Sequence, residues 1–214
     1  KDGSGDLFSL LCAFGYASKN NFQIINASLG FYYYEKDAPL ILKQVIQAKL
    51  TKRKILLICA AGNRDSSSDA KALQNRISES QLRNIDFNHF YPAALSSELS
   101  NIIAVTTVGI EPGDSILRVS PRQNYSDTKV NIGVMGDSSY FFINPLHKEY
   151  PYRYITGSSY ATPIFVGNAL RYIQYGSSFT SNGETLLEGM FHKKLIYSDD
   201  NLEGFIEGKR YTQK

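Results

Sequence analysis

The sequence predicts an α/β fold of three layers, in which helices flank both faces of a mostly parallel β-sheet. Two successive helix-to-strand units indicate this fold. Residues 6–19 place apolar side chains at helical spacing behind an N-capping aspartate, and residues 22–26 form a strand-like apolar run. Residues 37–50 repeat the helical pattern after Asp37, and residues 54–59 are again apolar. Strands separated by helices in this way pair in parallel and are covered on both faces.

The same patterns predict strands at 101–108, 129–134 and 140–143, and helices at 159–175 and 184–193. Between the second unit and these elements, residues 64–88 lose the apolar periodicity and are rich in Ser, Asp, Asn and Arg. We interpret this segment as a surface insertion with one short helix at 69–79.

Composition sets limits on the class of protein. The chain has 214 residues, 43% of them hydrophobic, which is enough to bury the core of one domain or the larger part of one. The net charge of +3 comes from 23 basic and 20 acidic residues spread along the chain, so nucleic acid is not an expected partner. No apolar stretch approaches the ~18 residues of a spanning helix, so no membrane partner is expected. We also expect no cofactor and no metal, because no acidic cluster has the spacing of calcium ligands.

Two cysteines, Cys12 and Cys59, lie in apolar runs, one helical and one strand-like. A free thiol in such a run behaves as a small hydrophobic side chain, so we expect both to be buried and unpaired. A disulfide or a reactive thiol is the alternative.

Two short motifs carry the candidate chemistry. Residues 157–163 read GSSYATP, which places a serine at a tight turn that leads into an apolar helix. In the first turn of a helix, unpaired N–H groups and the helix dipole favour the negative charge that develops during acyl transfer. Residues 60–63 read AAGN at the end of an apolar strand, so Asn63 can donate a side-chain N–H to the same oxyanion. The alternative for Asn63 is a turn-forming residue after Gly62.

Four sequence blocks, in this order, resemble the subtilisin-like serine peptidases. They are the substrate-binding strand at 25–30, the oxyanion-hole block of Ala60, Ala61, Gly62 and Asn63, a Tyr-Pro-Ala at 91–93 followed by Ile-Ala-Val at 103–105, and the nucleophile motif at 157–163. The resemblance covers residues 3–170 and implies a serine endopeptidase that hydrolyses peptide bonds through an acyl-enzyme. It makes Ser159, and not its neighbour Ser158, the nucleophile.

Two related classes fit the sequence less well. The sedolisin-like peptidases have a similar fold but carry an aspartate where Asn63 stands in this chain. An α/β-hydrolase requires a Gly-x-Ser-x-Gly elbow, which the chain lacks.

The resemblance also implies where a polypeptide substrate binds. An extended peptide lies between two segments and pairs with both through backbone hydrogen bonds. In this chain the segments are Gly3, Ser4 and Gly5 on one side and Ser28, Leu29 and Gly30 on the other. The alternative for the first segment is a flexible chain end.

Two departures from the family pattern concern the pocket for the P1 residue, which precedes the scissile bond. Arg64 follows the oxyanion asparagine where many relatives have an acid, and Phe90 precedes Tyr-Pro where many have glycine. We predict a P1 pocket that disfavours Lys and Arg and prefers small or acidic residues. The alternative places Arg64 in solvent and Phe90 in the core.

The base that a serine nucleophile needs is not recognisable in this sequence. The family supplies an aspartate and a histidine from motifs that precede the substrate-binding strands, and neither motif occurs here. The three histidines of the chain, His89, His147 and His192, do not lie in the histidine motif of the family. We therefore predict that residues 1–214 are the C-terminal portion of a single peptidase domain. Its partner is then a missing N-terminal segment that carries Asp and His, and this chain alone is inactive. The alternative is an inactive relative that serves as a peptide-binding or scaffolding module.

Overall fold

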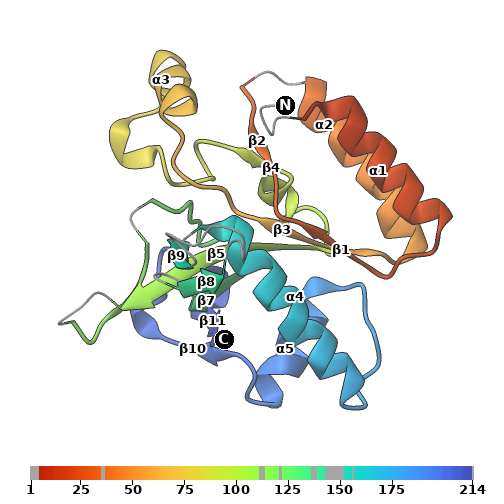
Figure 1. Cartoon of the computed structure of the whole chain (residues 1–214). Helices are drawn as coiled ribbons and strands as arrows, with labels where there is room; N and C mark the ends of the chain where they lie inside the picture. Colours follow the sequence, from red (N-terminus) through yellow and green to blue (C-terminus); the bar gives the residue numbers. More distant parts are fainter. Residues whose placement is uncertain are drawn as a thin grey trace.

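The computed structural model describes residues 5–34, 37–110, 114–120, 122–135, 139–142, 152–155 and 157–213, and for 139–142 and 152–155 it describes the backbone. A β-sheet lies between two helical layers (Figure 1). One layer contains α1 (Leu7–Lys19) and α2 (Asp37–Val45), and the other contains α4 (Ser158–Gln174) and α5 (Gly183–His192). The predicted three-layer α/β fold is confirmed.

The central sheet has seven strands in the described part of the chain. Their order is β1 (Ile24–Ala27), β3 (Leu56–Ala60), β5 (Ile102–Ile110), β7 (Ile132–Met135), β11 (Arg210–Thr212) and β10 (Tyr197–Ser198), with β6 (Leu117–Val119) paired to β5. The first five strands run parallel, whereas β10 and β6 pair antiparallel. Because parallel strands end at one edge of a sheet, the segments that follow β1 and β3 emerge beside each other there.

Strand β3 divides its side chains between two hydrophobic cores. Leu57 packs in one core with Phe14 of α1 and Leu42 of α2, whereas Leu56 packs in the other core with Phe165 of α4. All five side chains are at most 2% exposed. Successive strand residues point to opposite faces of a sheet, so a strand covered on both faces requires the uninterrupted apolar run that the sequence has.

The starts of α1 and β3 follow from local interactions. The Asp6 carboxylate accepts a hydrogen bond of 2.8 Å from the Ser9 N–H and caps α1 as predicted. Helix α2 continues through a π-helical turn (Ile46–Leu50) and a 3₁₀ turn (Thr51–Arg53) before the chain enters β3. The basic residues 52–54 are exposed in this connection.

The structure contains short strands that the sequence did not predict. They are β2 (Phe31–Tyr32), β4 (Phe90–Tyr91), β6, β9 (Tyr152–Ile155), β10 and β11. Each is two to four residues long, too short to display an alternating pattern. They form because distant partners pair: β2 with β4, β11 with β7, and β9 with β8 (Ser139–Phe142), which was predicted at 140–143.

Part of the segment 64–88 packs against the rest of the domain. Helix α3 (Ser66–Gln74) begins three residues earlier than predicted, because Asp65 caps it by accepting from the Ser67 N–H at 2.9 Å. A 3₁₀ turn follows at Glu79–Gln81. The fully buried residues of this segment are Ala72, Ile85 and Asn88.

The two cysteines differ in their surroundings. Cys59 is buried in β3, and burial raises the pKa of its thiol. Cys12 is exposed on α1, so the prediction that it is buried was wrong. Phe8 and Tyr16, each four residues away on the same helix face, are 75% and 64% exposed. Helix α1 therefore carries apolar side chains on its outer face as well as on its packed face, which made its inner face ambiguous from sequence.

Candidate active site

The two motifs that the sequence singled out meet at one edge of the central sheet. The turn at residues 61–63 follows β3, and Ser158 begins α4. The Gly62 N–H donates to the Ser158 Oγ at 3.0 Å, which joins the two segments. Ala60 and Ala61, which precede Gly62, are 1% and 0% exposed. This contact brings the ends of a strand and a helix together across 96 positions of sequence.

The Asn63 amide is held in one orientation. The Ser158 N–H and the Ser158 hydroxyl both donate to the Asn63 Oδ1, each at 2.9 Å. A backbone N–H can only donate, so the side-chain atom facing it is the oxygen and the Nδ2 points the other way. Among the described residues, no acceptor lies within hydrogen-bond distance of this Nδ2.

Gly157 leaves room for the Asn63 side chain. Its φ of 138° lies in a region that side-chain-bearing residues rarely adopt. A Cβ at this position would lie 3.3 Å from the Asn63 Nδ2. The backbone conformation therefore favours glycine here, and a side chain would also crowd the Asn63 amide.

The two serines of the motif have different environments. Ser158 is fully buried, and its hydroxyl accepts from Gly62 and donates to Asn63. Ser159, the second residue of α4, is partly exposed, and its hydroxyl has no hydrogen-bond partner among the described residues. Only Ser159 thus offers an accessible and unengaged hydroxyl, in the helical turn whose N–H groups lack helical acceptors.

Two buried amide side chains that the sequence did not predict, Gln123 and Asn124, form hydrogen bonds with this turn. The Gln123 Oε1 accepts from the Ser158 N–H at 2.9 Å, and Gln123 forms an antiparallel bridge with Asn63. The Asn124 Nδ2 donates to the Ala61 carbonyl at 2.8 Å. Gln123 and Asn124 are 2% and 0% exposed. No motif marks these residues in the sequence, because their role depends on the chain returning beside residues 61–63.

A buried network extends from Asn124 to residues 64–88. The Tyr32 hydroxyl lies 2.9 Å from the Asn124 Oδ1 and 3.0 Å from the Asn63 carbonyl, and it accepts from Arg83 at 3.3 Å. Arg83 is ion-paired with Asp69. Burial raises the pKa of Tyr32, so its hydroxyl keeps its proton near neutral pH. The network fixes α3 to the turn that carries Asn63.

The ring of Phe90 fills the space between two glycines. Phe90 is 8% exposed and packs edge-on against Tyr32, with ring centroids 4.9 Å apart. A Cβ on Gly62 would lie 2.8 Å from the Phe90 Cγ, and a Cβ on Gly30 would overlap the same ring. The side chain therefore occupies a slot that exists because both neighbours are glycine.

The remaining predicted site residues lie at the surface or outside the described residues. After β1, Ser28 is partly exposed, Leu29 is 49% exposed and Gly30 is exposed. Gly5 is exposed, and a Cβ there would meet nothing within 4 Å. Gly3 and Ser4 lie outside the described residues.

None of the histidines is joined to Ser159 by a described hydrogen bond. The His89 Nδ1 lies 2.9 Å from the Ile85 carbonyl, and His192 lies at the end of α5. His147 lies outside the described residues. Among the described residues, no three His, Cys, Asp or Glu side chains are grouped as metal ligands. No described helix has the length and apolar character needed to cross a membrane.

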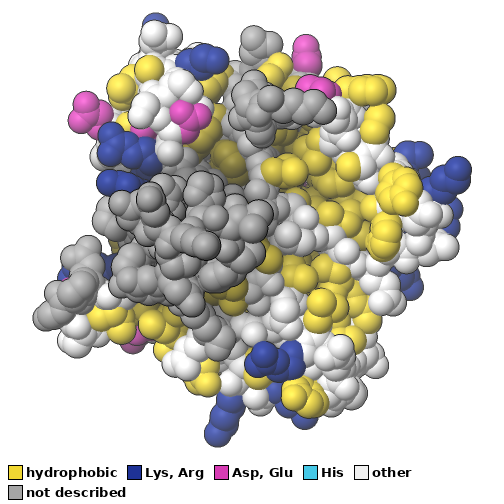
Figure 2. Space-filling model, in the orientation of Figure 1, with side chains coloured by type: hydrophobic (Ala, Val, Ile, Leu, Met, Phe, Trp, Pro, Cys, Tyr) yellow, Lys and Arg dark blue, Asp and Glu magenta, His cyan; other side chains and the backbone are white. Residues whose placement is uncertain are grey.

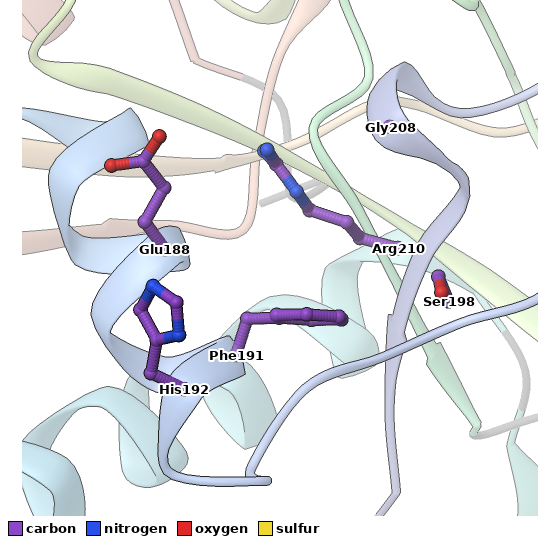
Figure 3. A pocket seen from close by; sticks show the side chains of 6 residues that line it. All are labelled: Glu188, Phe191, His192, Ser198, Gly208 and Arg210. Atoms are coloured by element: carbon purple, nitrogen blue, oxygen red, sulfur yellow. The ribbon is translucent and has the colours of Figure 1, made fainter.

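The described surface includes a hollow beside the candidate site and another that is remote from it. One, of about 380 Å³, is lined by Asn63, Arg64, Ser66, Arg122 and Gln123 and so adjoins the candidate site. The other, of about 400 Å³, lies between α5 and the C-terminal strands, where Phe191 and Arg210 extend into it from facing elements (Figure 3). The Arg210 guanidinium is already paired with the Glu184 carboxylate. No candidate site residue lines this second hollow.

Comparison with known proteins identifies the family. The model of the subtilase family matches residues 1–194, so the chain belongs to this family of serine peptidases. A curated relative, subtilisin-like protease 3 of Plasmodium falciparum (isolate 3D7), is 26% identical over 206 residues, which is 96% of this chain and 24% of the relative.

Solved structures show the same fold. The subtilase cytotoxin SubAB structure has a TM-score of 0.68 at 16% identity over 97% of this chain and 63% of its own. A cold-adapted subtilisin-like serine proteinase has a TM-score of 0.63 at 18% identity over 98% and 62% of the two chains. The predicted subtilisin-like fold is thus confirmed. The chain spans about a quarter of the curated relative and less than two thirds of these structures.

The network around Tyr32 gives a stability prediction. Tyr32→Phe removes a hydroxyl that accepts from Arg83 and donates its single proton to either the Asn124 Oδ1 or the Asn63 carbonyl, so we expect the free energy of unfolding to fall by about 1–3 kcal/mol. Chemical denaturation measures this change. Tyr175→Phe is the control, because Tyr175 is 80% exposed, and it is expected to change stability by less than about 0.5 kcal/mol. Equal effects of the two substitutions would contradict a structural role for the network.

Proposed function

We propose that this chain is the C-terminal portion of the peptidase domain of a serine endopeptidase. The Ser159 Oγ attacks the carbonyl carbon of a peptide bond, and a general base removes its proton. The amine then leaves with a proton from that base, and water hydrolyses the resulting ester to regenerate Ser159. The observation that carries this proposal is the fixed Asn63 amide, whose Nδ2 has no acceptor among the described residues and lies beside the helical turn that bears Ser159.

Asn63 is the proposed oxyanion donor. Its Oδ1 is occupied by Ser158, so the Nδ2 is oriented before any substrate binds. A donor that needs no reorganisation stabilises the developing charge most effectively. Removal of such a donor costs about 2.7–4 kcal/mol, a value that comes from a subtilisin and therefore from a member of the same family.

The general base is proposed to come from a partner segment. Strand β1 has only β3 as a partner, so one of its edges is open in the described structure. Figure 2 shows hydrophobic side chains gathered over α1 and this edge, where Phe8 and Tyr16 are exposed. An open sheet edge presents unpaired N–H and C=O groups that can pair with another segment. We therefore propose that an N-terminal segment carrying Asp and His adds a strand beside β1, consistent with solved relatives that are longer than this chain.

The proposed substrate is an extended polypeptide. Residues 28–30 follow β1 and are accessible, so their backbone groups can pair with a peptide by strand addition. The residues on the other side, Gly3, Ser4 and Gly5, are proposed to form the second edge.

Phe90 limits the proposed P1 pocket. Its ring fills the slot between Gly30 and Gly62, which leaves little volume for a substrate side chain. We propose that this site takes a small P1 residue and rejects the long side chains of Lys and Arg.

Kinetics of the complete protein test the proposed catalytic roles. Ser159→Ala is expected to lower kcat by about 10⁶-fold, and Asn63→Ala by about 10²–10³-fold with little change in KM; both magnitudes come from subtilisins. Ser178→Ala, an exposed serine after α4, is the control and leaves kcat unchanged. The isolated 214 residues are expected to show no turnover. Turnover by this chain alone that vanishes with Ser159→Ala would overturn the proposed need for a partner segment. A complete protein that binds peptides without cleaving them would instead be an inactive scaffolding relative.

P1 preference tests the role of Phe90. Phe90→Ala empties the slot, so kcat/KM for substrates with Leu or Phe at P1 should rise at least about tenfold relative to those with Ala. A P1-varied peptide library measures the ratio. Phe87→Ala is the matched control, because Phe87 is 49% exposed. If the alanine variant is unstable, Phe90→Leu can be measured instead, because it leaves a smaller cavity. Its ratio should lie between those of the unsubstituted protein and the alanine variant. An unchanged profile in both Phe90 variants contradicts the assignment.

A further inference from the structure

A hollow beside Asn63 carries two arginines, Arg64, which the sequence predicted at the P1 pocket, and Arg122, which has no predicted role. Arg64 and Arg122 line it together with Asn63, Ser66 and Gln123. Both arginines are exposed, and the Arg64 side chain is 64% exposed. The hollow is thus a basic pocket at the edge of the candidate active site.

The backbone holds the two arginines beside each other. The Arg64 N–H donates to the Arg122 carbonyl at 2.7 Å, next to the bridge between Asn63 and Gln123. Both side chains therefore start from adjacent points of the backbone, and two positive charges attract one anion more strongly than a single charge does.

Nearby acids do not neutralise both charges. Asp69 lies 3.8 Å from the Arg64 Nε, but it is ion-paired with Arg83. Asp65 caps α3 by accepting from Ser67 and Ser68, and these hydrogen bonds lower the pKa of its carboxyl. Among the described residues, Arg122 has no ion-pair partner. The two guanidinium groups are thus largely available to an external anion.

The pocket shares its wall with the proposed catalytic residues. Asn63 and Gln123 line the pocket and both accept from the Ser158 N–H, one residue before Ser159. Phe90, which fills the proposed P1 slot, does not line it. A peptide positioned at Ser159 therefore has a neighbouring residue within reach of the two arginines.

We propose that Arg64 and Arg122 bind the carboxylate of an Asp or Glu side chain of the polypeptide substrate, within three residues of the scissile bond. Guanidinium groups match the planar carboxylate and form charge-assisted hydrogen bonds with it. This inference rests on the proposed function, because that function places the peptide at Ser159. It adds an acidic neighbour to the small P1 residue.

Peptide binding to the complete protein with Ser159→Ala tests the pocket without requiring turnover. The probes are fluorescent peptides centred on alanine, with Glu or Gln at each position from P3 to P3′ in turn. At one position the Glu peptide should bind about tenfold more tightly than the Gln peptide. The advantage should shrink as salt is raised, because part of it is electrostatic attraction at an exposed site.

Substitution of the arginines decides the assignment. Arg64→Gln with Arg122→Gln should abolish the advantage of the Glu peptide, whereas Arg53→Gln, which removes an exposed charge before β3, should preserve it. Equal affinity for Glu and Gln peptides at every position overturns the inference, as does an advantage that survives in the double variant. If the unsubstituted protein cleaves nothing while the arginine-dependent advantage is present, the proposed catalysis fails and the carboxylate site stands.

Discussion

Two hydrogen bonds from Ser158 to the Asn63 side chain hold the candidate site together. They join the end of β3 to the start of α4 across 95 positions of sequence. Because both Ser158 atoms donate, the amide has a single orientation, and Gly157 leaves room for its Nδ2. The proposed oxyanion donor, the accessible Ser159 and the basic pocket beside Asn63 all take their positions from this contact.

Buried polar groups make that contact rigid. Gln123, Asn124 and Tyr32 surround the turn after β3, and none of their side-chain atoms is among the described buried atoms without a partner. A satisfied network in a low-dielectric interior stiffens the elements that it joins, whereas an unsatisfied one destabilises them. The network also reaches Arg83, so residues beyond Arg64 in the segment 64–88 help to hold the site although none of them has a proposed catalytic role.

Much of the fold followed from the sequence, because the strands buried on both faces are long apolar runs and the helices alternate with them. The sequence also predicted that residues 60–63 and 157–163 come together. Each motif can be recognised from a few consecutive residues, and both were assigned to the same oxyanion site. Gln123 and Asn124 were missed because their partners are set by the return path of the chain, which no short pattern encodes. Cys12 was misplaced because α1 has apolar side chains on two faces. Strands β10 and β11 have too few residues for a detectable period.

The central claim is that Ser159, and not the buried Ser158, is the activated hydroxyl. Treatment of the complete folded protein with a fluorophosphonate, followed by mass spectrometric mapping of the modified peptide, tests it most directly, because the reagent reacts with an activated serine. The structure predicts modification at Ser159 and its loss after unfolding, since activation depends on the folded site. Modification at Ser158, or none in the folded protein, would contradict the claim.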